Sequence, residues 1–174
     1  MNVIIYGSLH GSAKKYAEEL GKRLNIEVVN YKDVEDINAY ETIVYIGALY
    51  AGGVLGMKKT FAKLGSPEGH RLLIATVGLA DPTDAENIQN IEQGMARQLS
   101  KDVFMAASLF HLRGAIDYSK LGLKHKVMMG LLVRKALNLP EEKKNAEVRA
   151  MIETYGQVVD FVEFDTLAKI MDAV

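Results

Sequence analysis

The chain has 174 residues, of which 49% are apolar, so a single domain with a sizeable core is expected. Lys and Arg number 21 against 22 Asp and Glu, which excludes the strongly basic surface typical of nucleic-acid binding. The absence of cysteine excludes disulfides, thiolate chemistry and cysteine-ligated metal centres.

The N-terminal segment has no features of a targeting sequence. Met1 and Asn2 lead directly into an apolar run, without the basic start and long apolar centre of a signal peptide. The longest apolar stretch, about Val127 to Val133, is far shorter than the roughly 20 residues that a membrane-spanning helix needs. We therefore expect a cytoplasmic protein without a membrane span.

Short apolar segments at regular intervals predict the strands of the fold. These segments are continuous rather than alternating, which is typical of parallel strands covered by helices on both faces. They lie at residues 3–6, 28–31, 43–48 and 72–77, with a fifth candidate at 103–112.

The segments between these strands have the periodicity of amphipathic helices. Apolar residues at three- and four-residue steps predict helices over residues 13–24, 54–64, 85–99 and 148–162, with a short addition at 167–171. Thr83 and Glu86 have capping-box spacing and predict the start of the third helix.

The order of these elements predicts a five-stranded, doubly wound parallel sheet of order 2-1-3-4-5, with helices on both faces. Right-handed crossovers fold a βαβαβαβ pattern in this way, and we expect one domain over residues 1–174. Ligands of such sheets bind beyond the carboxyl ends of the strands, where the winding reverses. The loops that begin near Gly7, Gly47 and Gly78 are therefore the candidate ligand site.

The loop Gly7-Ser8-Leu9-His10-Gly11-Ser12 joins the first strand to the first helix. Unpaired N–H groups and the helix dipole attract an anion there, and two hydroxyls and an imidazole add hydrogen-bonding groups. The spacing matches neither the dinucleotide fingerprint nor the nucleotide-triphosphate loop, so a single phosphate fits better. The alternative is a tight turn in which Ser12 only caps the helix.

The run Ile4 to Ala13 resembles the loop that binds the FMN phosphate in flavodoxins, a hydroxyl-rich S/T-x-T-G-N-T pattern after the first strand. Ser8, Gly11 and Ser12 match or approximate that pattern. His10 and Ala13 stand where threonines are usual. The resemblance implies a flavodoxin-like fold with FMN as cofactor, held by these five residues, with backbone amides carrying more of the phosphate binding.

The next two loops lie where flavodoxins place the isoalloxazine ring. Leu49, Tyr50, Ala51 and Gly52 follow the third strand, and Tyr50 is the candidate for contact with a flat conjugated ring. The alternative is that this loop is only a flexible turn with Tyr50 on its surface.

The third loop contributes Thr76, Gly78 and Leu79 to the predicted flavin contacts but has no aromatic residue. The ring would therefore be stacked on one side only. Asp81 is expected to belong to the turn before Pro82.

A basic apolar insertion is predicted near residues 117–139. Its segment Lys120 to Arg134 carries no acidic residue, so it can be an ordinary helix with solvated lysines, or it can contact an anionic membrane or an acidic apolar ligand. With its lead-in from Phe110 to Tyr118, it resembles the flavodoxin-fold, quinone-dependent protoporphyrinogen oxidases. That resemblance implies a porphyrinogen substrate, a quinone acceptor and peripheral contact with the inner face of the membrane.

The leading hypothesis is an FMN-dependent oxidoreductase, with Arg113, Lys124 and Lys126 as candidate contacts for a carboxylated substrate or a lipid headgroup. No catalytic acid or base can be assigned from the sequence. The alternative is a flavodoxin-type electron carrier without its own substrate, although carriers of this kind usually surround the flavin with negative charge. The four histidines have no metal-binding spacing, so no metal site is predicted.

Overall fold

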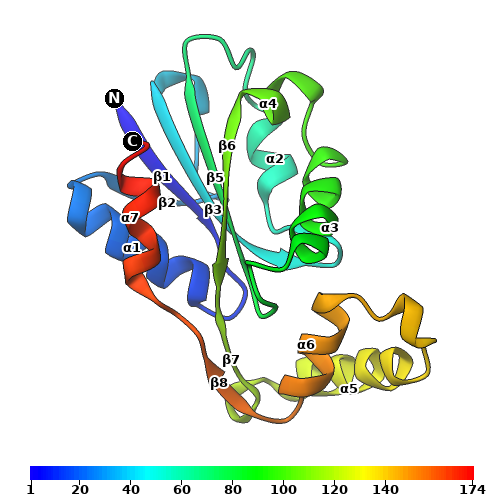
Figure 1. Cartoon of the computed structure of the whole chain (residues 1–174). Coiled ribbons are helices and arrows are strands. Elements are labelled where there is room, and N and C mark those ends of the chain that lie inside the picture. The colour runs from blue at the N-terminus through cyan, green and yellow to red at the C-terminus, as the bar shows by residue number, and fades with distance from the viewer.

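The computed structural model describes residues 1–174 and contains a central sheet of five parallel strands in the order β2-β1-β3-β5-β6. This is the predicted order 2-1-3-4-5, which is confirmed (Figure 1). A sixth, very short strand, β4, pairs antiparallel with the end of β3. The strands are β1 (Asn2–Gly7), β2 (Glu27–Asn30), β3 (Thr42–Tyr50), β4 (Gly53–Val54), β5 (Arg71–Gly78) and β6 (Ala107–Arg113).

Helices cover both faces of the sheet, as expected for continuous apolar strands. One face carries α1 (Ser12–Leu24) and α7 (Ala168–Met171), and the other carries α2 (Met57–Phe61), α3 (Ala85–Ala96) and α4 (Lys101–Ala106). Each face has its own core cluster, of 13 and 16 buried residues respectively. Short 3-10 turns are η1 (Ile37–Ala39), η2 (Tyr118–Lys120), η3 (Glu141–Lys143) and η4 (Phe164–Leu167).

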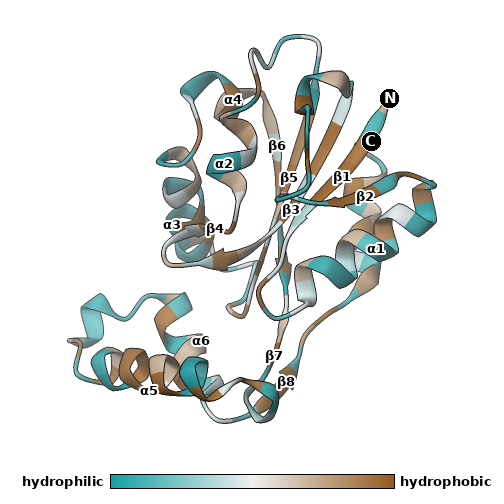
Figure 2. Ribbon diagram, turned by 180° about the vertical axis from the view of Figure 1, so that it is seen from behind, coloured by the Kyte–Doolittle hydropathy of each residue, from teal (hydrophilic) through white to brown (hydrophobic).

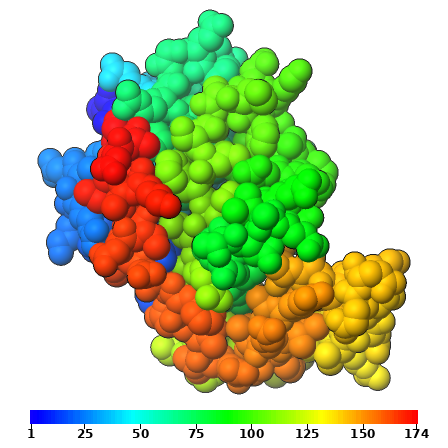
Figure 3. Space-filling view, viewed as in Figure 1, coloured from blue at the N-terminus to red at the C-terminus, as the bar shows by residue number.

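Between β6 and the C-terminal helix, the chain leaves the sheet and forms a lobe that we call the excursion, residues 115–160. It is built from β7 (Ala115–Asp117), α5 (Leu123–Leu137), α6 (Ala146–Thr154) and β8 (Val158–Asp160). Strands β7 and β8 pair antiparallel, so the outgoing and returning chains lie side by side. The lobe projects below the carboxyl ends of the sheet strands (Figure 1), and the space-filling view shows it in orange and yellow at one corner of the body (Figure 3).

The predicted helix over residues 148–162 is wrong in its second half. Helix α6 ends at Thr154, and Gly156 has a φ of 75°, a left-handed conformation that ends helices. The β-branched pair Val158 and Val159 then forms β8 against β7. The apolar periodicity therefore continued across a helix end and into a strand.

The predicted fifth strand, residues 103–112, begins too early. Residues 103–106 belong to α4, which starts where the Ser100 hydroxyl accepts a hydrogen bond from the Val103 N–H at 3.3 Å. Strand β6 begins only at Ala107. A side-chain cap thus placed a helical turn where the apolar run alone favoured a strand.

Two predicted helix starts also differ from the structure. Helix α3 is capped by the Asp84 carboxylate, which accepts from the Asn87 N–H at 2.8 Å, and not by Thr83. The helix expected over residues 54–64 is shorter, because Val54 pairs with Leu49 in the β3–β4 hairpin and α2 begins at Met57.

Candidate functional site

The loop between β1 and α1 presents an uncapped helix N-terminus. Gly11 occupies the N-cap position with a φ of 95°, no side chain caps α1, and its first turn contains no acidic residue. The Ser8 hydroxyl accepts a hydrogen bond from the Gly11 N–H at 3.0 Å, which closes the loop on itself. The first N–H groups of α1, from Ser12 and Ala13 onward, have no partner within the helix and are available to an anion.

The side chain of Ser12 is already engaged within the protein. Its hydroxyl accepts from the Ala115 N–H at 2.8 Å and donates to the Ala115 carbonyl at 3.3 Å. Gly114 permits this contact, because a Cβ there would lie 2.9 Å from Val77 and 3.2 Å from the Ser12 hydroxyl. Ser12 therefore offers a ligand its backbone N–H, while its hydroxyl holds the start of the excursion.

His10 lies in the same loop and is exposed together with Leu9. Partial burial lowers the pKa of His10, and the charge of His125 in the first turn of α5 lowers it further. The excursion therefore approaches the candidate phosphate loop from the side of α5. A neutral imidazole at position 10 would meet an anion as a hydrogen-bond donor rather than as a full positive charge.

The loop after β3 is a tight hairpin held by α3. Ala51 and Gly52, at its tip, have φ values of 49° and 78°, as a two-residue hairpin turn of type I′ requires at both positions. Gly94 of α3 packs directly on the tip, because a Cβ there would lie 2.6 Å from the Gly52 carbonyl oxygen. Tyr50 is 44% exposed, so its ring is accessible to a ligand.

A side chain also pins the other strand of this hairpin. The Gln98 amide oxygen accepts from the Val54 N–H at 2.7 Å, and its amide nitrogen donates to the Val54 carbonyl at 3.4 Å. Gln98 thus satisfies the backbone edge of β4 as a neighbouring strand would. The hairpin is held by α3 and by the residues that follow it, and Tyr50 lies exposed on its surface.

The loop after β5 contacts the hairpin through Leu49. A Cβ at Gly78 would lie 2.6 Å from the Leu49 Cδ1, so the glycine makes room for that side chain. Asp81 forms the turn before Pro82, as predicted, because its carboxylate accepts from the Thr83 N–H at 2.8 Å and hydroxyl at 2.7 Å. These hydrogen bonds lower the pKa of Asp81.

Arg113 is bound within the protein, which argues against its predicted role of contacting a substrate. Its guanidinium donates twice to the Leu79 carbonyl, from Nε at 3.1 Å and from Nη2 at 2.8 Å. The same guanidinium lies over the Phe161 ring, 3.7 Å from its centroid. Arg113 therefore ties the loop after β5 to both ends of the excursion.

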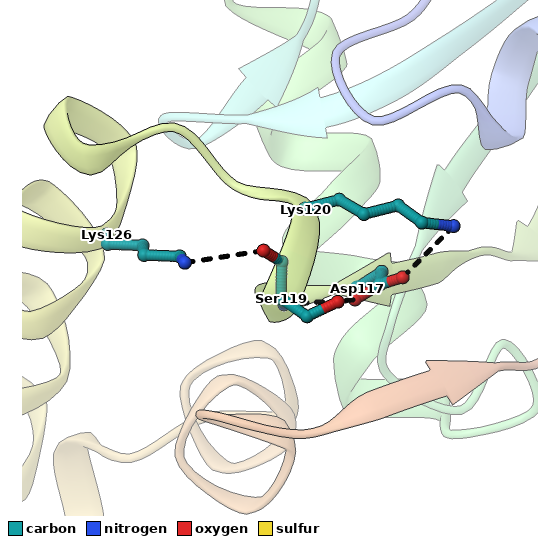
Figure 4. A network of polar contacts seen from close by, with 4 residues as sticks. All are labelled: Asp117, Ser119, Lys120 and Lys126. Carbon is teal, nitrogen blue, oxygen red and sulfur yellow. Dashed lines mark hydrogen bonds and ion pairs between the residues drawn. The ribbon is translucent and has the colours of Figure 1, made fainter.

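The basic residues at the start of α5 are likewise partly engaged. Lys126 donates to the Ser119 carbonyl at 3.3 Å, while Lys120 pairs with Asp117 at 3.3 Å (Figure 4). The Asp117 carboxylate also accepts from the Ser119 hydroxyl. This network orders the turn between β7 and α5, so Lys126 has a local structural partner besides any ligand.

Two adjoining clefts lie where the sheet, α3 and the excursion meet. The inner cleft, of about 10 Å³, is lined by Thr76, Gly78 and His111, and an outer cleft of about 160 Å³ is lined by polar residues of α3 and α6. Leu49, Ile91 and Glu147 line both. The excursion thus supplies one wall of a cleft that reaches the predicted flavin-contact residues.

The polar lining of these clefts was not predicted from the sequence. Asn90 of α3 and Arg97, which directly follows this helix, face Asn145 and Glu147 at the start of α6 across the outer cleft. Burial against this wall raises the pKa of Glu147, although part of its side chain is exposed. The apolar stripe that predicted a helix from residue 148 signalled α6, but nothing local indicated that its start faces α3.

The structure brings the predicted site residues together at one end of the sheet. The loops after β1, β3 and β5 follow neighbouring strands, whose ends are in register at Gly7, Gly47 and Thr76. No group of three or more His, Asp or Glu side chains is arranged to hold a metal ion. What the sequence did not reveal is how the first turns of α1 anchor the excursion. Ser12 is bound to Ala115, and the Tyr16 hydroxyl donates to the Arg113 carbonyl and accepts from the Glu163 N–H.

Comparison with known proteins identifies the class. The sequence profile of the flavodoxin domain family matches residues 3–143, which span β1 to the end of α5 and beyond. The chain belongs to the flavodoxin domain family. Among curated proteins, no sequence matches the chain.

Several solved flavodoxins are similar in structure. A mutant flavodoxin from Fusobacterium nucleatum, bound to flavin mononucleotide, is 17% identical over 68% of this chain and 71% of that chain, with a TM-score of 0.46. A mutant flavodoxin from Pseudomonas aeruginosa is 20% identical over 79% and 97%, with a TM-score of 0.40. Flavodoxin 1 from Bacillus cereus is 14% identical over 68% and 87%, with a TM-score of 0.40. The family assignment rests on the profile match and on the sheet order.

Proposed function

We propose that this chain is an FMN-binding redox protein of the flavodoxin type. The observation that carries the proposal is the uncapped N-terminus of α1 after the first strand, at the winding switch of a flavodoxin-family sheet. The donor set fits a phosphate monoester, because it offers backbone N–H groups, the Ser8 hydroxyl and the His10 imidazole without a competing carboxylate.

The remaining predicted contacts would hold the ring at the neighbouring strand ends. Tyr50 and Leu49 come from the fixed hairpin, and Thr76, Gly78 and Leu79 come from the end of β5 and its loop. Bound FMN would supply one- and two-electron chemistry, while the protein orients the ring and sets its electrostatic surroundings. A fixed hairpin favours this role, because a preorganised site loses little entropy on binding.

Titration with FMN, followed by quenching of flavin fluorescence, tests this proposal directly. We expect stoichiometric binding, and Ser8→Ala should weaken it by about tenfold, since hydrogen bonds to charged groups contribute about 1.5 kcal/mol or more. Ser66→Ala is the matched control, because its hydroxyl also accepts from a backbone N–H, that of Glu68 at 3.1 Å, but lies before β5 at the opposite end of the sheet, and it should change the Kd less than threefold. Failure of the natural chain to bind FMN would refute the proposal.

A second candidate function is an FMN-dependent oxidoreductase with its own substrate. The observation that favours it is the outer cleft, in which the excursion places Asn145 and Glu147 opposite α3 and next to Leu49. Oxidation of protoporphyrinogen with a quinone acceptor is the specific reaction indicated by the resemblance of the insertion. Photoreduction separates the two: a carrier accumulates a stable one-electron form, whereas a two-electron enzyme passes through it with little trace.

Contact of α5 with an anionic membrane surface is part of this second candidate. Leu123, Val127 and Leu131 are 80%, 56% and 64% exposed on a helix that carries no acidic residue (Figure 2). No helix of the structure combines the length and the apolar character needed to cross a bilayer. Sedimentation with anionic liposomes tests this contact in the double variant Lys124→Glu/Lys126→Glu. If the double variant sediments with the liposomes as well as the natural chain does, the membrane contact is refuted. Cytoplasmic residence stays a prediction.

A further inference from the structure

An unusual polar group interrupts the apolar inner face of the sheet beside α3. His111 of β6 is in register with Thr76 of β5, and its Nδ1 lies 2.8 Å from the Thr76 hydroxyl. Its Nε2 lies 3.7 Å from the Glu92 carboxylate of α3. Further along the same face of β6, Ala107 and Leu109 pack against the hydrophobic core. The imidazole therefore marks the point where the core gives way to the cleft.

The burial of this group is graded from the core to the solvent. Thr76 is 1% exposed, the His111 side chain is 10% exposed and Glu92 is 41% exposed. The imidazole thus lies between a buried hydroxyl and a carboxylate that solvent reaches. That arrangement gives His111 a route for proton exchange with bulk water through the Glu92 side.

His111 also lines the inner cleft together with Leu49 and Gly78, which the proposed function assigns to contact with the flavin ring. A negative charge that develops at this cleft in a partly buried setting favours protonation of a neighbouring imidazole. By thermodynamic linkage, protonation of the imidazole then favours reduction of a cofactor bound at the cleft by the same free energy.

We propose that His111 takes up a proton from solvent when a cofactor bound at these strand ends is reduced, and releases that proton on reoxidation. This inference rests on the proposed function. The electrons come from an external reductant and enter the cofactor, while the imidazole gains one proton from the buffer and no bond of the chain breaks. Glu92 acts as a positioning residue, because it orients the ring and attracts the proton.

The charges that face His111 come from three elements. Glu92 of α3 is the nearest, Glu147 of α6 lines the same cleft, and Arg113 lies two residues further along β6. The Arg113 guanidinium is held by Leu79 and Phe161. Burial lowers the pKa of His111 below its ordinary value of about 6.5, and the Glu92 carboxylate opposes that effect. The imidazole is therefore mainly neutral at pH 7 before any negative charge develops at the cleft.

The test is an NMR titration of the histidine ring protons in FMN-loaded protein, oxidised and then fully reduced with dithionite. The His111 ring signals are assigned as those that disappear from the spectrum of the His111→Gln variant. We expect the His111 pKa to rise by roughly one unit on reduction, which is a tenfold gain in proton affinity. His70 is the internal control: it precedes β5 at the opposite end of the sheet, and its ring signals should not respond to reduction.

Variants separate this role from a merely structural one. Glu92→Gln should lower the His111 pKa in both redox states, since it removes the opposing charge. In the natural protein, a plot of the reduction potential against pH should change slope in the pH range where His111 titrates. His111→Gln should abolish that change, and the matched variant His70→Gln should keep it.

Two results would overturn the inference, and they differ from failure of the proposed function. One is a His111 titration that is the same in oxidised and reduced protein with FMN bound, as expected of a polar pair that only joins β5 to β6. The other is a change of slope that persists in His111→Gln. Absence of FMN binding in the preceding fluorescence titration would instead refute the proposed function itself, and this inference with it.

Discussion

Tyr16 of α1 joins the two ends of the excursion, and removing its hydroxyl should loosen the whole lobe. The hydroxyl donates to the Arg113 carbonyl at 2.8 Å and accepts from the Glu163 N–H at 2.9 Å. The ring is fully buried and meets Phe164 edge to face at 5.7 Å, so Tyr16→Phe keeps the apolar packing. Only the two hydrogen bonds are lost.

Two partly buried backbone groups would then have no partner, at a cost of about 1–3 kcal/mol each in full burial. Because both lie near solvent, we expect a total loss of about 2–4 kcal/mol in the free energy of unfolding. For a chain of this length that corresponds to a fall in Tm of about 5–15 °C. Urea denaturation measures the loss in the free energy of unfolding, and amide hydrogen exchange shows which residues lose protection.

Tyr45→Phe is the matched control for this variant. Tyr45 is also fully buried, but its hydroxyl makes a single hydrogen bond, to the Leu55 carbonyl at 2.5 Å on the other side of the sheet. It should cost less, and the exchange of residues 115–160 should stay unchanged. If Tyr16→Phe accelerates exchange there no more than Tyr45→Phe does, the anchoring role of Tyr16 is refuted.

Three further variants test the hairpin and the cleft. In Gly94→Ala the new Cβ would lie 2.6 Å from the Gly52 carbonyl oxygen, so the variant should lose about 1–3 kcal/mol in the free energy of unfolding, measured by urea denaturation. It should also bind FMN more weakly, because the clash displaces the hairpin. An unchanged FMN affinity would contradict the proposed contact of the hairpin with the flavin ring. Ala51→Gly should raise the free energy of unfolding by up to about 1 kcal/mol, since it removes the left-handed strain of a φ of 49°, and any destabilisation would count against that strain. Burial raises the pKa of Glu147 in the folded protein. The protonated side chain therefore contributes fully to the free energy of unfolding below the unfolded-state pKa of about 4, and this contribution is lost as the pH rises through the higher folded-state pKa. Glu147→Gln should therefore gain Tm relative to the natural chain as pH increases from 4 to 7, and a constant difference would argue against the burial effect.

The sheet order was predictable from the sequence because its signals are local and redundant. Each strand segment is a continuous apolar run, each crossover has a helical stripe, and right-handed connections leave few topologies. The carboxyl ends of the strands then locate the candidate loops without knowledge of any side-chain contact. This is why the loops near Gly7, Gly47 and Gly78 were found together.

The excursion was not predictable in the same way, because its contacts are distant in sequence. Ser12 and Ala115 are 103 positions apart, and Tyr16 and Glu163 are 147 positions apart. Nothing in the run from Gly7 to Ser12 indicates that one hydroxyl of the loop is already used. Likewise, Gly156 looked like a residue inside a helical pattern, and only its positive φ shows that the helix has ended.

The excursion bears on the choice between carrier and enzyme. A carrier exchanges electrons with partner proteins, so the edge of its ring has to be accessible, whereas an enzyme gains from a cleft that positions a small substrate. Here the roots of the excursion are bonded to α1, just after the candidate phosphate loop, through Ser12, and to the loop after β5 through Arg113. Its α6 forms one wall of the cleft beside Leu49. Since the lobe is bonded to the candidate cofactor loops, a change that frees it should alter cofactor binding in either role, but only an enzyme should also lose its substrate site.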